Sequence, residues 1–180
     1  MALFRSRSGK VFTWSAALLL GACGGLMGGP RSGDKAVANL ESTRGNFVLG
    51  TVTFVQTGDK VLVTADIRGL PANGVAAMHV HENGDCTAPD GMSAGGHFNP
   101  FKKPHGQGAE RHVGDMPNLQ ADATGRALYK AELDQMSVSD GPGGILGKAV
   151  IVHRDADDYK SQPAGNAGPR VACGVIQRAG

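Results

Sequence analysis

Short runs of apolar and β-branched residues, each bounded by Gly, Pro, Asn or Asp, recur along most of this sequence. They span residues 48–56, 61–68, 75–82, 127–133, 148–153 and 171–176. Runs of this length and composition are typical of β-strands, because branched side chains pack well on a pleated surface. No segment has the apolar spacing of an amphipathic helix. The pattern therefore predicts an all-β domain.

Two long segments between these runs, 83–118 and 154–169, lack strand character. The chain is 41% hydrophobic and 19% charged, so a packed core is feasible, and its 28 glycines favour many turns. Loops this long in a compact domain are usually functional or disordered. We expect these two to carry the function.

All six histidines lie within or beside these two segments. His79 and His81 are two apart on an expected strand, so both imidazoles share a face and can reach one metal ion. Taken alone, such a pair is more often a surface feature. His153 ends another expected strand, where an exposed surface histidine is the alternative.

The first long segment adds three more histidines and a carboxylate. His97, His105, His112 and Asp115 lie in Gly-, Pro- and Asn-rich sequence without an apolar period. Three imidazoles and one carboxylate suit a tetrahedral zinc site. A bound metal would supply folding energy that this loop cannot obtain from burial.

The N-terminus has the features of a processed leader. Arg5, Arg7 and Lys10 precede an apolar stretch at 11–20 that is short for a membrane span. The letters LGAC at 20–23 then resemble a bacterial lipobox. An ordinary secretory signal followed by a chance cysteine is the alternative.

We therefore divide the chain into three parts. Residues 1–22 are expected to be a lipoprotein-type signal peptide, and residues 23–35 a flexible Gly-rich tether that starts at a lipidated Cys23. Residues 36–180 form the domain. Lipidation of Cys23 leaves Cys86 and Cys173 as one pair in an oxidising compartment.

Charge gives no sign of a nucleic-acid partner. The net charge is +2, and no cluster of basic residues stands out. Loss of the three cations in 1–22 leaves 15 Lys and Arg against 16 Asp and Glu, a net charge of −1. Any attraction for an anion must then come from local charge placement.

Four separate motifs, in order, resemble the copper–zinc superoxide dismutase family. They are HVHENGDC at 79–86, GGHFNP at 95–100, RHVGD at 111–115 and GNAGPRVACGVI at 165–176. The short spacing from His81 to Cys86 looks like the bacterial branch of that family. The resemblance spans nearly all of residues 36–176 and implies a Greek-key antiparallel β-barrel or sandwich with two long functional loops.

The resemblance also implies a role for each matched residue. Copper is held by His79, His81, His97 and His153, and zinc by His97, His105, His112 and Asp115, so that His97 bridges the two ions and takes part in catalysis. Arg170 attracts and positions the substrate anion, Cys86 and Cys173 form a disulfide, and Asp157 links the two metal sites from behind. A solvated charge is the alternative for Asp157.

One departure concerns substrate guidance. Pro163 stands where many family members have a second guiding lysine. Lys160 lies close by in sequence and is a possible substitute, although an ordinary solvated lysine is the slightly favoured reading.

The activity implied is dismutation of superoxide to oxygen and hydrogen peroxide by a redox-cycling copper bridged through a histidine to zinc. The leader implies a periplasm-facing, lipid-anchored protein of the bacterial envelope that protects it from superoxide, with a homodimer left open. A metal-storage module and a structural β-sandwich without chemistry are the competing hypotheses. The complete ligand set and Arg170 argue against both.

Overall fold

The computed structural model describes Met1 and residues 29–180. The expected signal peptide after Met1, Cys23 and residues 24–28 of the expected tether therefore lie outside the described residues. Strand β1 starts at Lys35, the last residue of the expected tether. In the described part of the chain, no helix is sufficiently long and apolar to cross a membrane.

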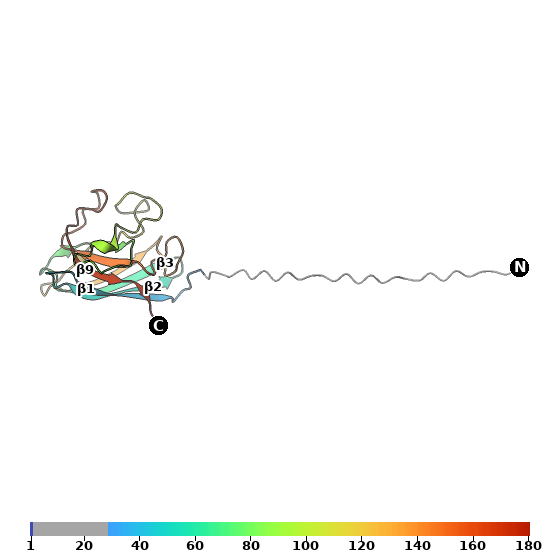
Figure 1. Ribbon diagram of the computed structural model, residues 1–180, viewed down its shortest axis with the longest axis horizontal. Coiled ribbons are helices and arrows are strands. Elements are labelled where there is room, and N and C mark those ends of the chain that lie inside the picture. The colour runs from blue at the N-terminus through green and yellow to red at the C-terminus, as the bar shows by residue number, and fades with distance from the viewer. Residues whose placement is uncertain (2–28) are drawn as a thin grey trace.

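The described chain is built of antiparallel strands, as the sequence predicts (Figure 1). In chain order they are β1 Lys35–Ser42, β2 Leu49–Thr57, β3 Lys60–Arg68, β4 Val75–Ala76, β5 Met78–His81, β6 Leu119–Gln120, β7 Ala127–Leu133, β8 Ala149–His153, β9 Arg170–Val175 and β10 Gln177–Arg178. A short 3-10 helix, η1, covers Met92–Ala94.

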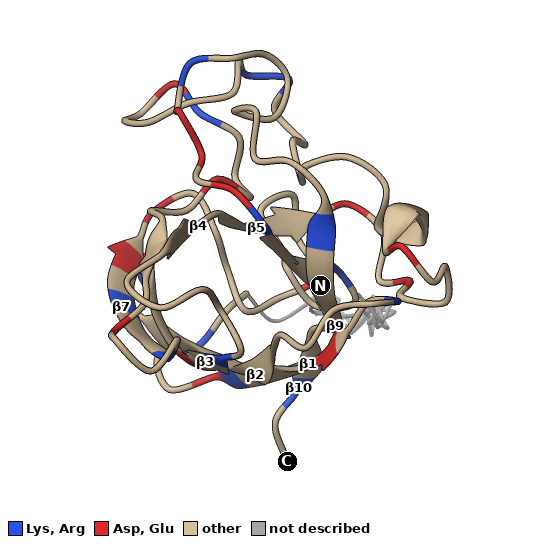
Figure 2. Cartoon of the chain, turned by 90° about the vertical axis from the view of Figure 1, so that its left-hand side faces the viewer, with Lys and Arg blue, Asp and Glu red and all other residues tan. Residues whose placement is uncertain are grey.

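The main sheet has the strand order β5-β8-β9-β1-β2-β3-β7, with β10 paired to β1 and a small β4-β6 pair beside it. The neighbours β9–β1 and β3–β7 are distant in sequence, so the chain crosses the sheet in Greek-key fashion. Viewed end on, the sheet curls round the core as a partial barrel (Figure 2). The predicted fold class is thus confirmed.

The core is formed by strands in which buried and solvent-facing side chains alternate. In β2 and β3 every second side chain is buried, and Val52, Phe54, Val61, Val63 and Ile67 point inward. The expected run 75–82 divides into β4 and β5, which pair with different strands. Strand β1 lies outside all of the strand ranges predicted from the sequence.

Strands β5 and β8 are buried on both faces. One face joins the barrel core through Met78, Val80, Val150 and Val152. The opposite face of β8 belongs to a second small cluster of Ala94, Ala149, Ile151 and Cys173. Residues outside the barrel therefore cover this side of the sheet, and the functional side chains lie beneath them.

Candidate metal centre

Three histidines are carried by two paired strands. In the β5–β8 pair, His79 lies opposite Ile151 and His81 opposite Ala149. Because alternate residues share a face, His79 and His81 point to the side away from the barrel core. His153 ends β8 at an irregularity in its pairing with β9, and its Nε2 lies 3.3 Å from Nε2 of His81.

Main-chain hydrogen bonds hold the first long loop along β5. The carbonyl of Val80 accepts from the N–H of Phe98 at 2.8 Å, and the N–H of Val80 donates to the carbonyl of Gly114 at 2.9 Å. A Cβ on Gly114 would lie 2.1 Å from the Val80 carbonyl oxygen, so only glycine fits there. His97 and Asp115 adjoin these bonded residues in the loop and are thereby placed beside β5. His97 forms an isolated β-bridge with His81, and Asp115 forms one with His79.

The residues expected to ligate metals meet in two overlapping groups. Each group offers four ligand atoms that lie within 4.8 Å of one another, and His97 belongs to both. All seven residues are buried, with at most 8% of any exposed. The groups are His79, His81, His97 and His153, and His97, His105, His112 and Asp115.

The chemistry of the two groups fits copper and zinc. Among the described residues, His79 Nδ1 and His97 Nε2 are buried without a hydrogen-bond partner, whereas His105 Nδ1 and His112 Nδ1 have only the Asp115 carboxylate beside them, at 3.1 and 3.3 Å. An unpaired buried polar atom costs about 1–3 kcal/mol, a cost that metal coordination removes. Four imidazoles suit copper, whereas three imidazoles with one carboxylate suit a tetrahedral zinc ion.

The second nitrogen of most of these rings is fixed by the protein. His81 Nδ1 donates to the carbonyl of Gly95 at 3.0 Å, and His153 Nδ1 donates to the carbonyl of Gly168 at 3.1 Å. These bonds set the tautomer, so that Nε2 of each ring is free to ligate. Both acceptors are main-chain carbonyls, which is why residue type alone did not reveal them.

Asp157 joins the two groups from behind. Its Oδ2 lies 2.8 Å from His79 Nε2 and its Oδ1 lies 2.9 Å from His105 Nε2. The side chain is fully buried, so the alternative of a solvated charge does not hold. Asn118 brackets it, accepting from the Asp157 N–H and donating to the Asp157 carbonyl, each at 2.9 Å. Asn118 was not among the residues predicted from the sequence, where its only signal is an amide at the end of a loop.

The electrostatics differ between the two groups. Burial lowers the pKa of His97 to about 4 and that of His153 to about 3, and neighbouring histidines add to the effect at His153. At His105 burial acts in the same direction, but Asp115 and Asp157 outweigh it and raise its pKa to about 9. His97 and His153 are therefore neutral and able to ligate, whereas His105 must lose a proton first.

Arg170 lies at the rim of the group on β5 and β8. Its Nη1 donates to the carbonyl of Gly91 at 2.7 Å and its Nη2 to that of Gly95 at 2.5 Å. The Gly95 carbonyl thus receives bonds from both His81 and Arg170. Arg170 also lines a hollow of about 340 Å³ together with Arg44 and Met92.

A second hollow of about 180 Å³ opens beside His153. Pro163 lines it, whereas Lys160 is exposed and is not among its lining residues. Gln162, which also lines this hollow, donates to the carbonyls of both His105 and Lys160.

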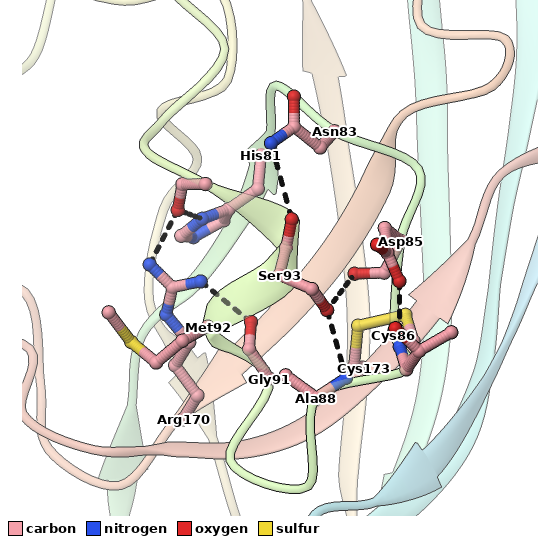
Figure 3. The surroundings of a disulfide bond; sticks show 12 residues. His81, Asn83, Asp85, Cys86, Ala88, Gly91, Met92, Ser93, Arg170 and Cys173 are labelled. Carbon is pink, nitrogen blue, oxygen red and sulfur yellow. Dashed lines mark hydrogen bonds between the residues drawn. A yellow bond between two sulfur atoms is a disulfide. The ribbon is translucent and has the colours of Figure 1, made fainter.

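The expected disulfide is present. Cys86 and Cys173 are bonded, with their Cα atoms 5.8 Å apart, and they tie the first long loop to β9 (Figure 3). Ser93 accepts from the N–H of Ala88 at 3.1 Å and donates to the Asp85 carbonyl at 2.9 Å, which holds η1 near the bridge.

Comparison with known proteins gives one consistent result. The sequence model of the family described as "Copper/zinc superoxide dismutase (SODC)" matches residues 48–176. "Superoxide dismutase [Cu-Zn] 2" of Aquifex aeolicus is 42% identical over 149 residues, which cover 79% of this chain and 86% of the relative. "Superoxide dismutase [Cu-Zn]" of Candida glabrata is 44% identical over 152 residues, covering 79% and 96%.

A solved structure agrees with these sequences. The "Crystal Structure Analysis of the clock protein EA4" superposes with a TM-score of 0.74 and 42% identity, covering 84% of this chain and 99% of the other. The fold, the relatives and the two groups of candidate metal ligands that share His97 all indicate the same protein family. The chain belongs to the copper/zinc superoxide dismutase family, and is an oxidoreductase that uses copper and zinc to dismutate superoxide.

Proposed function

We propose that His79, His81, His97 and His153 hold copper and that His97, His105, His112 and Asp115 hold zinc. The observation that carries this assignment is the placement of the two nitrogens of His97. Nδ1 lies 2.8 Å from Asp115 Oδ1 in one group, and Nε2 is buried without a partner in the other. One imidazole ring would therefore offer one nitrogen to each ion.

Copper bound in this group supplies one-electron redox chemistry, and zinc supplies a fixed positive charge. The chain provides the acid–base and binding groups. We assign His97 Nε2 as the atom that carries a proton towards the departing peroxide. Nε2 is buried and has no hydrogen-bond partner among the described residues, so it is free to hold that proton.

We assign Arg170 to substrate binding. A guanidinium has five N–H groups, and two nitrogens of Arg170 donate to Gly91 and Gly95. The remaining donors are assigned to a small anion, and Arg170 lines a hollow together with the cation of Arg44 and the carboxylate of Asp90. The protein fixes the guanidinium before substrate arrives, so little reorganisation is needed.

The finer location is also a proposal. We propose that Cys23 is lipidated and anchors the domain to the bacterial envelope, facing the periplasm, where it removes superoxide. The LGAC motif supports this proposal, as does the Cys86–Cys173 disulfide, which is expected in an oxidising compartment.

The assignment of the two sites predicts different metal losses in two variants. His153→Ala should abolish dismutation and lower copper content while zinc stays bound, because His153 belongs only to the copper group. Asp115→Ala should release zinc first. Copper and zinc content by mass spectrometry, together with superoxide decay per bound copper, measures both. Equal loss of both metals in each variant would contradict the two-site assignment.

A further inference from the structure

The β5 edge continues past His81 in an irregular ladder. In a regular antiparallel pair, Glu82 and Gly96 would exchange two main-chain hydrogen bonds. One is made, from the N–H of Glu82 to the carbonyl of Gly96 at 2.9 Å. The N–H of Gly96 instead donates to the side-chain Oε1 of Glu82 at 3.0 Å. The Glu82 carbonyl accepts from Lys148 Nζ at 3.0 Å.

The Glu82 carboxylate has therefore replaced its own main-chain carbonyl as the acceptor. Its side chain also packs on the neighbouring glycine, since a Cβ on Gly95 would lie 2.6 Å from Oε1 and 2.8 Å from Cγ of Glu82. Gly95 has a φ of 74°, a conformation that favours glycine. The turn at Gly95 and Gly96 is thus shaped against the Glu82 side chain.

This turn carries the acceptor shared by His81 and Arg170. The Gly95 carbonyl fixes the His81 ring and one end of the Arg170 guanidinium, and His97 follows Gly96 directly. In Figure 3, one carbonyl oxygen receives dashed bonds from both His81 and Arg170. A small shift of the turn would move a copper-side histidine and the anion-binding arginine together.

We propose that Glu82 is a positioning residue for the copper side of the centre. It acts as a hydrogen-bond acceptor, and its bond to Gly96 N–H holds the Gly95 carbonyl where His81 and Arg170 need it. The proposal rests on the roles assigned above to His81 and Arg170. Glu82 is exposed, so its replacement leaves the barrel core intact.

Two variants separate the role of the Glu82 carboxylate as a hydrogen-bond acceptor from the role of its charge. Glu82→Ala removes both, whereas Glu82→Gln keeps an oxygen that can accept from Gly96 and removes only the charge. Azide serves as the probe anion for the copper-loaded protein, with its dissociation constant measured from absorption. We expect Glu82→Ala to weaken azide binding about fivefold, the effect of one ordinary hydrogen bond. Glu82→Gln should stay within about twofold of the native protein.

A second readout does not depend on copper. In metal-free protein, amide hydrogen exchange at Gly96 should be faster in Glu82→Ala and near native in Glu82→Gln. Asp59→Ala, at the β2–β3 turn, is the matched control for the loss of one exposed carboxylate and should change neither measurement.

Several outcomes would overturn the proposal. If the Ala and Gln variants weakened azide binding equally, Glu82 would act by its charge. If amide hydrogen exchange at Gly96 were unchanged in Glu82→Ala, the bond from Gly96 to Glu82 would not hold the turn in place. If native copper-loaded protein failed to dismutate superoxide, the proposed site roles would fail, while the azide and exchange measurements would still decide the role of Glu82.

Discussion

At the residue scale, Arg170 combines two tasks, since it supports two loop carbonyls and faces a hollow. We predict that Arg170→Glu lowers the dismutation rate per bound copper at least about tenfold, because reversing a charge at a partly desolvated site raises the barrier by over about 1.4 kcal/mol. Arg170→Lys should lose less, since it keeps the charge without the planar pair of donors. Rates at several ionic strengths measure both, and the native rate should fall most as salt rises.

The contrary result for Arg170 is also defined. If Arg170 serves only to support Gly91 and Gly95, Arg170→Glu will lower the melting temperature and metal retention together. The rate per bound copper would then remain near the native value.

His105 gives a pH dependence at the same scale. Its pKa is raised to about 9 by Asp115 and Asp157, so in metal-free protein it holds a proton at pH 7.5. Zinc must displace that proton. Zinc affinity should therefore rise with pH and level off above pH 9, and binding at pH 7.5 should release about one proton. Calorimetry in buffers of different ionisation enthalpy counts the protons, and a count of zero would contradict the pKa shift.

At the scale of elements, the attachment of the first long loop to β5 depends on Gly114. We predict that Gly114→Ala weakens zinc binding and lowers the free energy of unfolding by about 2 kcal/mol or more, because its Cβ would overlap the Val80 carbonyl. Gly141→Ala is the matched control, since its Cβ would lie 3.6 Å from the nearest atom, Ser139 Oγ. Chemical unfolding of both metal-free variants makes the comparison. Equal destabilisation would count against a steric role for Gly114.

The elements also show which parts of the structure could be predicted. The alternation of apolar and polar residues in β2 and β3 could be predicted from residue type and spacing. The same is true of the motifs that contain the seven expected ligands, which the structure brings together. The roles of the Gly95 and Gly168 carbonyls could not be predicted from residue type, because every residue has a carbonyl. Only the tertiary fold places these two beside a histidine. The roles of Asn118 and Glu82 could not be predicted either, because each side chain bonds a partner that is distant in sequence.

At the scale of the whole molecule, the prediction concerns processing. Cys23→Ala should convert a membrane-bound protein into a soluble, active one, because several acyl chains contribute roughly 0.8 kcal/mol per buried methylene. Cleavage before Cys23 also removes Trp14, so the mature protein should show only the emission of Tyr129 and Tyr159. Mass spectrometry of cell-derived protein that retained unmodified residues 1–22 would rule this out.

The single carboxylate of Asp157, in contact with His79 and His105, has a thermodynamic consequence. A group that touches ligands of both ions makes the two binding equilibria interdependent. By linkage, the factor by which bound zinc changes the affinity for copper must equal the factor by which bound copper changes the affinity for zinc. The order in which the two ions are loaded therefore alters the path to the complete centre and leaves its total binding free energy unchanged.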